Sequence, residues 1–144
     1  MSQQRKTPTL IDVRGPRFSA TLTVIVLAIA LATQNAWVLA FQAVVFAIGA
    51  IRGPQYTPYA FIFKRIVKPR LRGEVITEDS RPPQFAQTVG FLFALAGLLG
   101  AAIGSAAVFN VAVGFALAAA FLNSVFNYCL GCEMYLLVLR IRTR

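Results

Sequence analysis

The chain has 144 residues, of which 58% are hydrophobic and 13% are charged, and it contains no histidine. A soluble domain carries about 25% charged residues, so this composition indicates a membrane protein. The missing histidine removes the commonest general base and metal ligand, and the net charge of +9 lies at the ends of apolar segments, which argues against nucleic-acid binding.

The first predicted element is a helical hairpin. Apolar stretches cover Phe18–Ala32 and Ala36–Ile51, and the polar residues 33–35 separate them. A membrane crossing needs about 20 helical residues, so one helix through both stretches would be far too long. We therefore expect transmembrane helices at about 17–34 and 36–52, joined by a tight turn.

The segment that follows, TPYAFIFKRIVKPR, predicts a helix at the membrane surface over about 57–68. Thr57 can cap it and Pro58 suits its first turn, while Lys64 and its neighbouring cations would face the lipid headgroups. Residues 70–83 mix both charges with Gly and Pro, and we expect them to form a cytoplasmic loop.

The second half is apolar almost without a break from Phe85 to Leu139, which is enough for two or three crossings. With two crossings, at about 84–104 and 109–139, all 14 Lys and Arg residues lie on one side of the membrane. The positive-inside rule then places both termini in the cytoplasm. We expect the chain to lie in the inner (plasma) membrane. The last helix is over-long, so it must tilt, break or project, and Gly131 is a weak point.

The predicted fold is therefore all-α: a single membrane domain over 1–144, formed by a four-helix bundle of two hairpins with an interfacial helix between them. The sequences RGPRFSAT at 14–21 and RPPQFAQT at 81–88 indicate that the hairpins are copies of one repeat. The alternative is that both sequences reflect what a helix entering a membrane favours.

Small residues mark one face of the third predicted helix, at Gly90, Gly97, Gly100 and Gly104. Lipid gives no hydrophobic drive between helices, so close backbone approach at small residues holds them together. We interpret the stripe as a contact within the chain rather than a dimer seam.

Polar residues lie late in the fourth predicted helix, at Asn123, Asn127 and Tyr128. Amides at this depth usually bond across helices, so the set is either a helix contact or a polar path.

The sequence NYCLGCEMY places Cys129, Cys132 and Glu133 on one face if the helix continues through them. One interpretation is a redox or sulfur-handling dithiol with Glu133 as proton relay, although a carboxylate and low dielectric disfavour the thiolate. A second is that the cysteines pack as small apolar residues. Metal binding is weaker, because one chain offers two sulfurs and a carboxylate, and no metal or cofactor is predicted.

On the sequences DVRGPRF, PPQFAQTVG and above all NYCLGCEMY, the chain resembles an uncharacterised bacterial membrane family, domain of unknown function 4395. The resemblance implies a four-span membrane protein with a C-L-G-C signature in its last helix. It also implies an association with thioredoxin-like or sulfurtransferase proteins. A second cluster of candidate residues, at the cytoplasmic entry, is Arg81, Phe85 and Gln87.

Three functions remain open from the sequence. The first is a dithiol that exchanges electrons or sulfur with a cytoplasmic partner. The second is a non-catalytic subunit or scaffold of a larger membrane complex or homodimer. The third is a small channel or carrier for a sulfur species, so the chain is not assigned as an enzyme.

Overall fold

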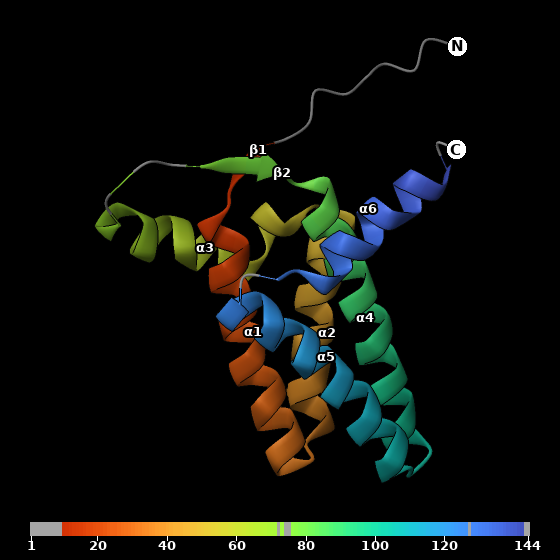
Figure 1. The fold of residues 1–144 in the computed structure, drawn as a ribbon. Helices are drawn as coiled ribbons and strands as arrows, with labels where there is room; N and C mark the ends of the chain where they lie inside the picture. Colours follow the sequence, from red (N-terminus) through yellow and green to blue (C-terminus); the bar gives the residue numbers. More distant parts are fainter. Residues whose placement is uncertain (1–9, 72, 74–75, 127, 143–144) are drawn as a thin grey trace.

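A computed structural model describes residues 10–71, 73, 76–126 and 128–142 (Figure 1). Its elements in chain order are β1 (Leu10–Asp12), α1 (Arg14–Thr33), α2 (Ala36–Ile51), η1 (Pro54–Tyr56), α3 (Pro58–Ile62), η2 (Phe63–Val67), η3 (Lys68–Arg70), β2 (Thr77–Asp79), α4 (Arg81–Ala102), α5 (Ala106–Phe126) and α6 (Leu130–Arg142). The all-α prediction is confirmed, with the addition of one small sheet.

The long helices α1, α2, α4 and α5 lie side by side, with α2 packed on α4 and α1 packed on α5 (Figure 1). The sheet, α3 and α6 lie at one end of this group, and the two hairpin turns lie at the other. The two ends therefore differ chemically, since the described cations lie at the sheet end and the turns carry none.

Within the part of the chain that the structure describes, α1, α4 and α5 are long and apolar enough to cross a membrane. At most 28% of the residues in their most apolar windows are buried inside the protein. Outward-facing apolar side chains on this scale need a nonpolar surrounding. The helices thus indicate a membrane protein, and α2 is a shorter apolar helix beside them.

The predicted last helix, at about 109–139, needs a correction because the structure divides it. Helix α5 ends at Phe126 and α6 begins at Leu130, with the backbone N–H of Tyr128 bonded to the carbonyl of Leu122 at 3.1 Å. Apolar residues on both sides of the break hid it from the sequence pattern. After the break, α6 leaves the bundle at an angle (Figure 1).

The predicted surface helix is present as one segment of changing helical type, from α3 through η2 to η3. Its start agrees with the expected cap, since Thr57 Oγ1 accepts the backbone N–H of Ala60 at 3.2 Å. The loop expected at 70–83 was partly wrong, because Thr77–Asp79 forms β2 and pairs with Leu10–Asp12. Each strand has only three residues and its partner lies far away in the sequence. The alternation of polar and apolar residues is therefore too short to predict a strand.

Each strand enters a long helix through an aspartate that lies two residues before an arginine. Asp12 Oδ1 accepts the backbone N–H of Arg14 at 3.0 Å, and the Arg14 guanidinium donates back to the same carboxylate at 2.8 Å. Asp79 and Arg81 repeat both bonds at 2.9 Å and 2.6 Å. Aspartate suits this turn because its short side chain reaches the backbone two residues on. The guanidinium hydrogen bonds hold the pKa of Asp12 and that of Asp79 below the usual value.

The sheet relates the two halves of the chain by an approximate two-fold rotation. Its antiparallel register places Ile11 opposite Glu78. These residues are 67 positions apart, which is also the separation of Arg14 and Arg81 in the repeated entry sequence. An antiparallel pair centred on equivalent residues maps each strand onto the other, as a two-fold axis requires. The sequence repeat is therefore also a structural repeat.

The hairpin turns correspond in the same way. Gln34 (φ 53°) and Gly104 (φ 75°) each follow the first helix of their half in the left-handed region. The next residue caps the second helix, with Asn35 Oδ1 and Ser105 Oγ each accepting a backbone N–H. Glutamine is uncommon at this backbone angle, and the Gln34 amide bonds Asn110 Oδ1 of the other hairpin at 2.7 Å.

The buried core follows the repeat as well. Its members are Leu27, Ala30, Leu39, Ala43, Phe46, Ala94, Phe109, Val113 and Ala116. When the helix starts are aligned, Leu27 corresponds to Ala94 and Phe46 to Ala116, so a large side chain in one half matches a small one in the other. Such alternation lets side chains interdigitate across facing helices.

The two halves also cap each other. Arg17 Nε donates to the carbonyl of Ser124 near the end of α5 at 3.0 Å. Gln84, which is 67 residues after Arg17, donates Nε2 to the carbonyl of Ala50 near the end of α2 at 2.8 Å. Carbonyls in the last turn of a helix have no partner within that helix. A side chain on the entry helix of each half therefore supplies a hydrogen-bond donor to the last turn of the second helix of the other half.

The glycine stripe on α4 lies at contacts within the chain, as predicted. A Cβ atom on Gly90 or Gly97 would lie 2.7 Å from a side chain of α2, and one on Gly100 would lie 2.7 Å from the backbone of α5. Gly104 lies after the end of α4 and forms the turn instead. The predicted pair of Gly100 and Gly104 on one helical face is thus not present.

Candidate thiol site

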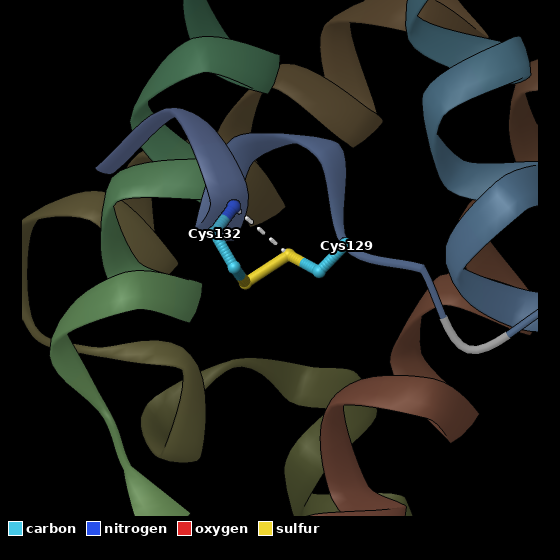
Figure 2. Close-up of a disulfide and its surroundings, with 2 residues drawn as sticks. All are labelled: Cys129 and Cys132. Carbon is cyan, nitrogen blue, oxygen red and sulfur yellow. Dashed lines mark hydrogen bonds between the residues drawn. A yellow bond between two sulfur atoms is a disulfide. The ribbon is translucent and has the colours of Figure 1, made fainter. Parts of the chain in front are cut away.

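The two cysteines lie at the start of α6. Cys129 directly precedes the first helical residue and Cys132 lies in the first turn, and their sulfur atoms form a disulfide bond with the Cα atoms 5.1 Å apart. Figure 2 shows the bond closing the first turn of the helix. The sequence interpretation required a continuous helix through Cys129, Cys132 and Glu133, and the break before Leu130 converts this site into a helix N-terminus.

Cys129 caps the helix with both its side chain and its backbone. Its Sγ accepts the backbone N–H of Cys132 at 3.1 Å (dashed in Figure 2), and its carbonyl accepts the backbone N–H of Glu133 at 3.0 Å. The N–H groups of a first turn otherwise lack partners, and the helix dipole adds partial positive charge there. The Cys129 sulfur thus has a backbone donor and the positive end of a helix beside it, which the sequence argument from Glu133 did not include.

The same cap occurs at α3 in the other half of the repeat. Thr57 Oγ1 accepts the N–H of Ala60 three residues on, and the Thr57 carbonyl accepts the N–H four residues on. Cys129 makes both bonds with Cys132 and Glu133, at an offset of 72 residues from Thr57. Helix α6 is therefore the counterpart of α3, and the cysteine pair replaces a threonine cap and an alanine.

An aromatic pair holds each of these short helices on the entry helix of its own half. The ring of Phe18 lies 5.8 Å from that of Phe63, and the ring of Phe85 lies 5.7 Å from that of Tyr135. Helix α6 lies close against α4 at Gly131, where a Cβ atom would lie 2.6 Å from Cα and Cβ of Ala86. The glycine between the cysteines thus fixes where the disulfide lies against α4.

The surroundings of the disulfide are partly open. Cys129 and Cys132 are half-buried, Tyr128 and Leu130 are exposed, and Glu133 is exposed in the first helical turn. An acidic residue in this turn stabilises a helix through the dipole, which gives Glu133 a structural role beside the predicted proton relay. Among the described residues, no cluster of His, Cys, Asp and Glu suited to a metal ion is found.

The predicted polar path is only partly visible. Asn123 is partly buried near the end of α5, Tyr128 is exposed beside the disulfide, and Asn127 lies outside the described residues. Next to Asn123, the hydroxyl of Ser124 bonds Thr21 Oγ1 at 2.8 Å. A path through these residues remains a prediction.

The predicted entry cluster does not converge on one point. Arg81 pairs with Asp79, and Phe85 contacts the ring of Tyr135. Gln87 packs against Gly49 of α2, and its Oε1 is buried without a hydrogen-bond partner. Phe85 is the member that reaches the helix with the cysteines.

A buried polar pair escaped the sequence analysis. Gln42 is fully buried in α2, where its Oε1 accepts the hydroxyl of Tyr59 at 2.6 Å and its Nε2 has no partner. Burial raises the pKa of Tyr59 to about 12. The signal was a glutamine inside an apolar run.

Comparison with known proteins agrees with the signature sequences. No curated protein and no solved structure matches the chain. A family model does match, over residues 11–140, and so covers strand β2, most of β1, all the long helices and the cysteine segment. The chain belongs to the family described as domain of unknown function 4395 (DUF4395).

Proposed function

We propose that this protein spans the membrane four times and uses Cys129 and Cys132 as a dithiol–disulfide couple with a cytoplasmic partner. The observation that carries the proposal is the disulfide in the first turn of α6, with Cys129 Sγ accepting a backbone N–H at 3.1 Å. A buried structural cysteine needs neither a second cysteine three residues away nor a helix N-terminus.

The four crossings would be α1, α2, α4 and α5, with α3 and α6 lying at the membrane surface. Arg14 and Arg81 start the two entry helices, and Arg52 follows α2, so these cations share the end that carries the sheet. The positive-inside rule assigns that end to the cytoplasm, and the proposed location is the inner membrane. The disulfide would then face cytoplasmic thiol chemistry.

The proposed exchange is a two-electron transfer. The Cys129 thiolate attacks a disulfide of the partner, so that a mixed disulfide forms and one partner thiolate leaves. Cys132 then loses its proton to water and attacks the Cys129 sulfur, which releases the second partner thiolate. The partner is reduced by two electrons, Cys129 and Cys132 become a disulfide, and the reverse steps reduce the chain.

The resemblance to the family supplies the class of partner, a thioredoxin-like or sulfurtransferase protein. Exposed Tyr128 and Leu130 beside the half-buried sulfurs offer an apolar contact for it. The α6 counterpart α3 lacks thiols, so the exchange belongs to the second half alone.

The first prediction tests the order of attack. In native membranes, Cys132→Ser should accumulate a mixed disulfide through Cys129, because the resolving thiol is missing. Cys129→Ser should accumulate little, because Cys132 lacks the capping position. The measurement is non-reducing electrophoresis after thiol trapping, with mass spectrometry of the adduct.

Differential alkylation of the wild-type protein in the same membranes provides the control. We expect both cysteines, while they form the disulfide, to be unreactive toward the alkylating reagent. After a reductant is added, both should be labelled. Cysteines that label equally with and without reductant, together with no adduct in either serine variant, would exclude the redox function.

A scaffold role is the second candidate, and one observation favours it. Beyond the cysteines, α6 exposes Met134, Leu136, Leu137 and Val138, which are apolar on more than one side. Helix α6 would then dock a neighbouring subunit, and Cys129→Ser/Cys132→Ser would preserve that complex during co-purification.

A further inference from the structure

A cavity of about 290 Å³ lies in the first half of the repeat, where β1, the start of α1, η1 and the α3–η2 segment meet. Its walls include Ile11, Asp12, Gln55, Phe63, Lys64 and Lys68. Cavities for complete cofactors usually start at about 300 Å³, so this one suits a small group. It lies at the sheet end of the molecule, well apart along the sequence from the thiol site.

The charges at this cavity do not balance. The Asp12 carboxylate is already paired with Arg14 at 2.8 Å, and Lys68 Nζ is a second cation 3.8 Å from the same carboxylate. Lys64 Nζ donates to the carbonyl of Gln55 at 3.2 Å, which is a neutral partner. Among the described residues of the cavity wall, Lys64 and Lys68 are the cations and Asp12 is the carboxylate, which Arg14 already pairs. The excess charge is therefore positive and favours an anion.

The same segment exposes apolar side chains beside the cavity. Phe61, Ile62 and Ile66 are exposed, and the guanidinium of Arg65 lies 4.9 Å from the ring centre of Phe61. Apolar and cationic side chains on one short helical segment are typical of an element lying in the headgroup layer of a membrane. The mouth of the cavity is therefore at the level of lipid headgroups.

The other half of the molecule shows that the repeated fold does not demand a cation at the position of Lys64. At the 72-residue offset of the two caps, Lys64 corresponds to Leu136 and Arg65 to Leu137. Lys68 corresponds to Arg140 and Arg70 to Arg142, so two cations are common to both halves. The two additional cations belong to the half with the cavity.

We propose that this cavity binds the phosphate of an anionic phospholipid, with Lys64 and Lys68 as its ligands. The carboxylate of Asp12 does not repel the phosphate, because Arg14 neutralises it. The apolar wall at Ile11 and Phe63 contacts the glycerol region, and the acyl chains remain in the bilayer beside Phe61 and Ile62.

The test measures lipid retained by the full-length protein in detergent. The protein is incubated with equal amounts of phosphatidylglycerol and phosphatidylcholine, and bound lipid is counted by native mass spectrometry. Wild-type protein should retain phosphatidylglycerol in preference, and Lys64→Gln/Lys68→Gln should lose about fivefold in affinity for each lysine removed. Lys64→Arg/Lys68→Arg, which keeps both charges, should retain the lipid.

Arg65→Gln/Arg70→Gln is the matched control, because it removes two charges from the same segment outside the cavity wall. An equal loss of phosphatidylglycerol in the two double-glutamine variants would show that only the general surface charge matters. This result would overturn the proposed site. Displacement of phosphatidylglycerol by millimolar inorganic phosphate would assign the cavity to a free anion instead. Equal retention of both lipids by the wild-type protein, which needs no variant to fold, would also overturn the proposal.

Discussion

The helix caps at Thr57 and Cys129 differ in the element of the capping atom, which is oxygen in one and sulfur in the other. Thr57 Oγ1 and Cys129 Sγ occupy equivalent positions and accept equivalent N–H groups, at 3.2 Å and 3.1 Å. An oxygen in this position only caps the start of a helix, whereas a sulfur there can also form and break a bond. The proposed thiol site therefore occupies a position that has a structural role in the other half.

Gly131 leads to the second prediction. Gly131→Ala should destabilise the protein by about 1–3 kcal/mol, because the new methyl group would lie 2.6 Å from Ala86 and overpack the contact between α6 and α4. Thermal unfolding in detergent measures the loss.

Gly114→Ala is the matched control in α5, where an added Cβ meets no atom within 4 Å. Alanine favours a helix over glycine by up to about 1 kcal/mol, so this variant should be neutral or more stable. A Gly131→Ala protein as stable as Gly114→Ala would contradict the close contact.

Asp12 leads to the third prediction. Hydrogen bonds from Arg14 lower the pKa of Asp12, so its stabilising effect is present above the unfolded pKa and is lost as the pH falls through the folded pKa. Asp12→Asn should therefore lower stability at pH 7 by about 1–2 kcal/mol and flatten the decline between pH 5 and 3. Unfolding midpoints across this range provide the measurement.

We expect Glu78→Gln to change the stability in the opposite direction to Asp12→Asn. Burial, with the charge of Asp79 as a smaller cause, raises the pKa of Glu78, so its ionised form costs stability near neutral pH and protonation removes that cost. The glutamine variant should be at least as stable as wild type at pH 7. Parallel pH profiles for both variants would contradict the assigned roles of the two carboxyl groups.

Helices and turns that depend on local composition could be predicted from the sequence. Features that depend on contacts with residues distant in the sequence could not. The hairpins were predictable because apolar runs and polar turns are local signals. The end of α5 was not, since its last-turn carbonyl at Ser124 is bonded by Arg17, more than a hundred residues away. The spacing of Cys129 and Cys132 showed that a thiol pair was present, but only the break before Leu130 made it a helix cap.

The strands illustrate a signal that could have been found. The repeat was read from Arg14 and Arg81 onward, yet the identity extends two residues upstream to Asp12 and Asp79. An aspartate before each entry arginine would have predicted two equivalent turns. The pairing of the strands themselves depends on the two-fold arrangement of the halves, which local sequence does not encode.

The whole molecule leads to the fourth prediction, on membrane topology. If α1, α2, α4 and α5 all cross, single cysteines placed at Gln34 and at Ser105 in a Cys129→Ser/Cys132→Ser background should react with an impermeant maleimide added outside intact cells. A cysteine at Arg70 should react only after permeabilisation. Labelling of the two turns from opposite sides would leave an odd number of crossings between them and contradict the arrangement.

The mutual capping of the halves has a consequence for biogenesis. When the ribosome has completed the first hairpin, Arg17 still lacks its acceptor on Ser124, which is 107 residues further along the chain, and β1 still awaits β2. The first hairpin therefore cannot complete these contacts until synthesis of the second one is nearly finished. The two halves of this small protein assemble late, after the last helices have been made.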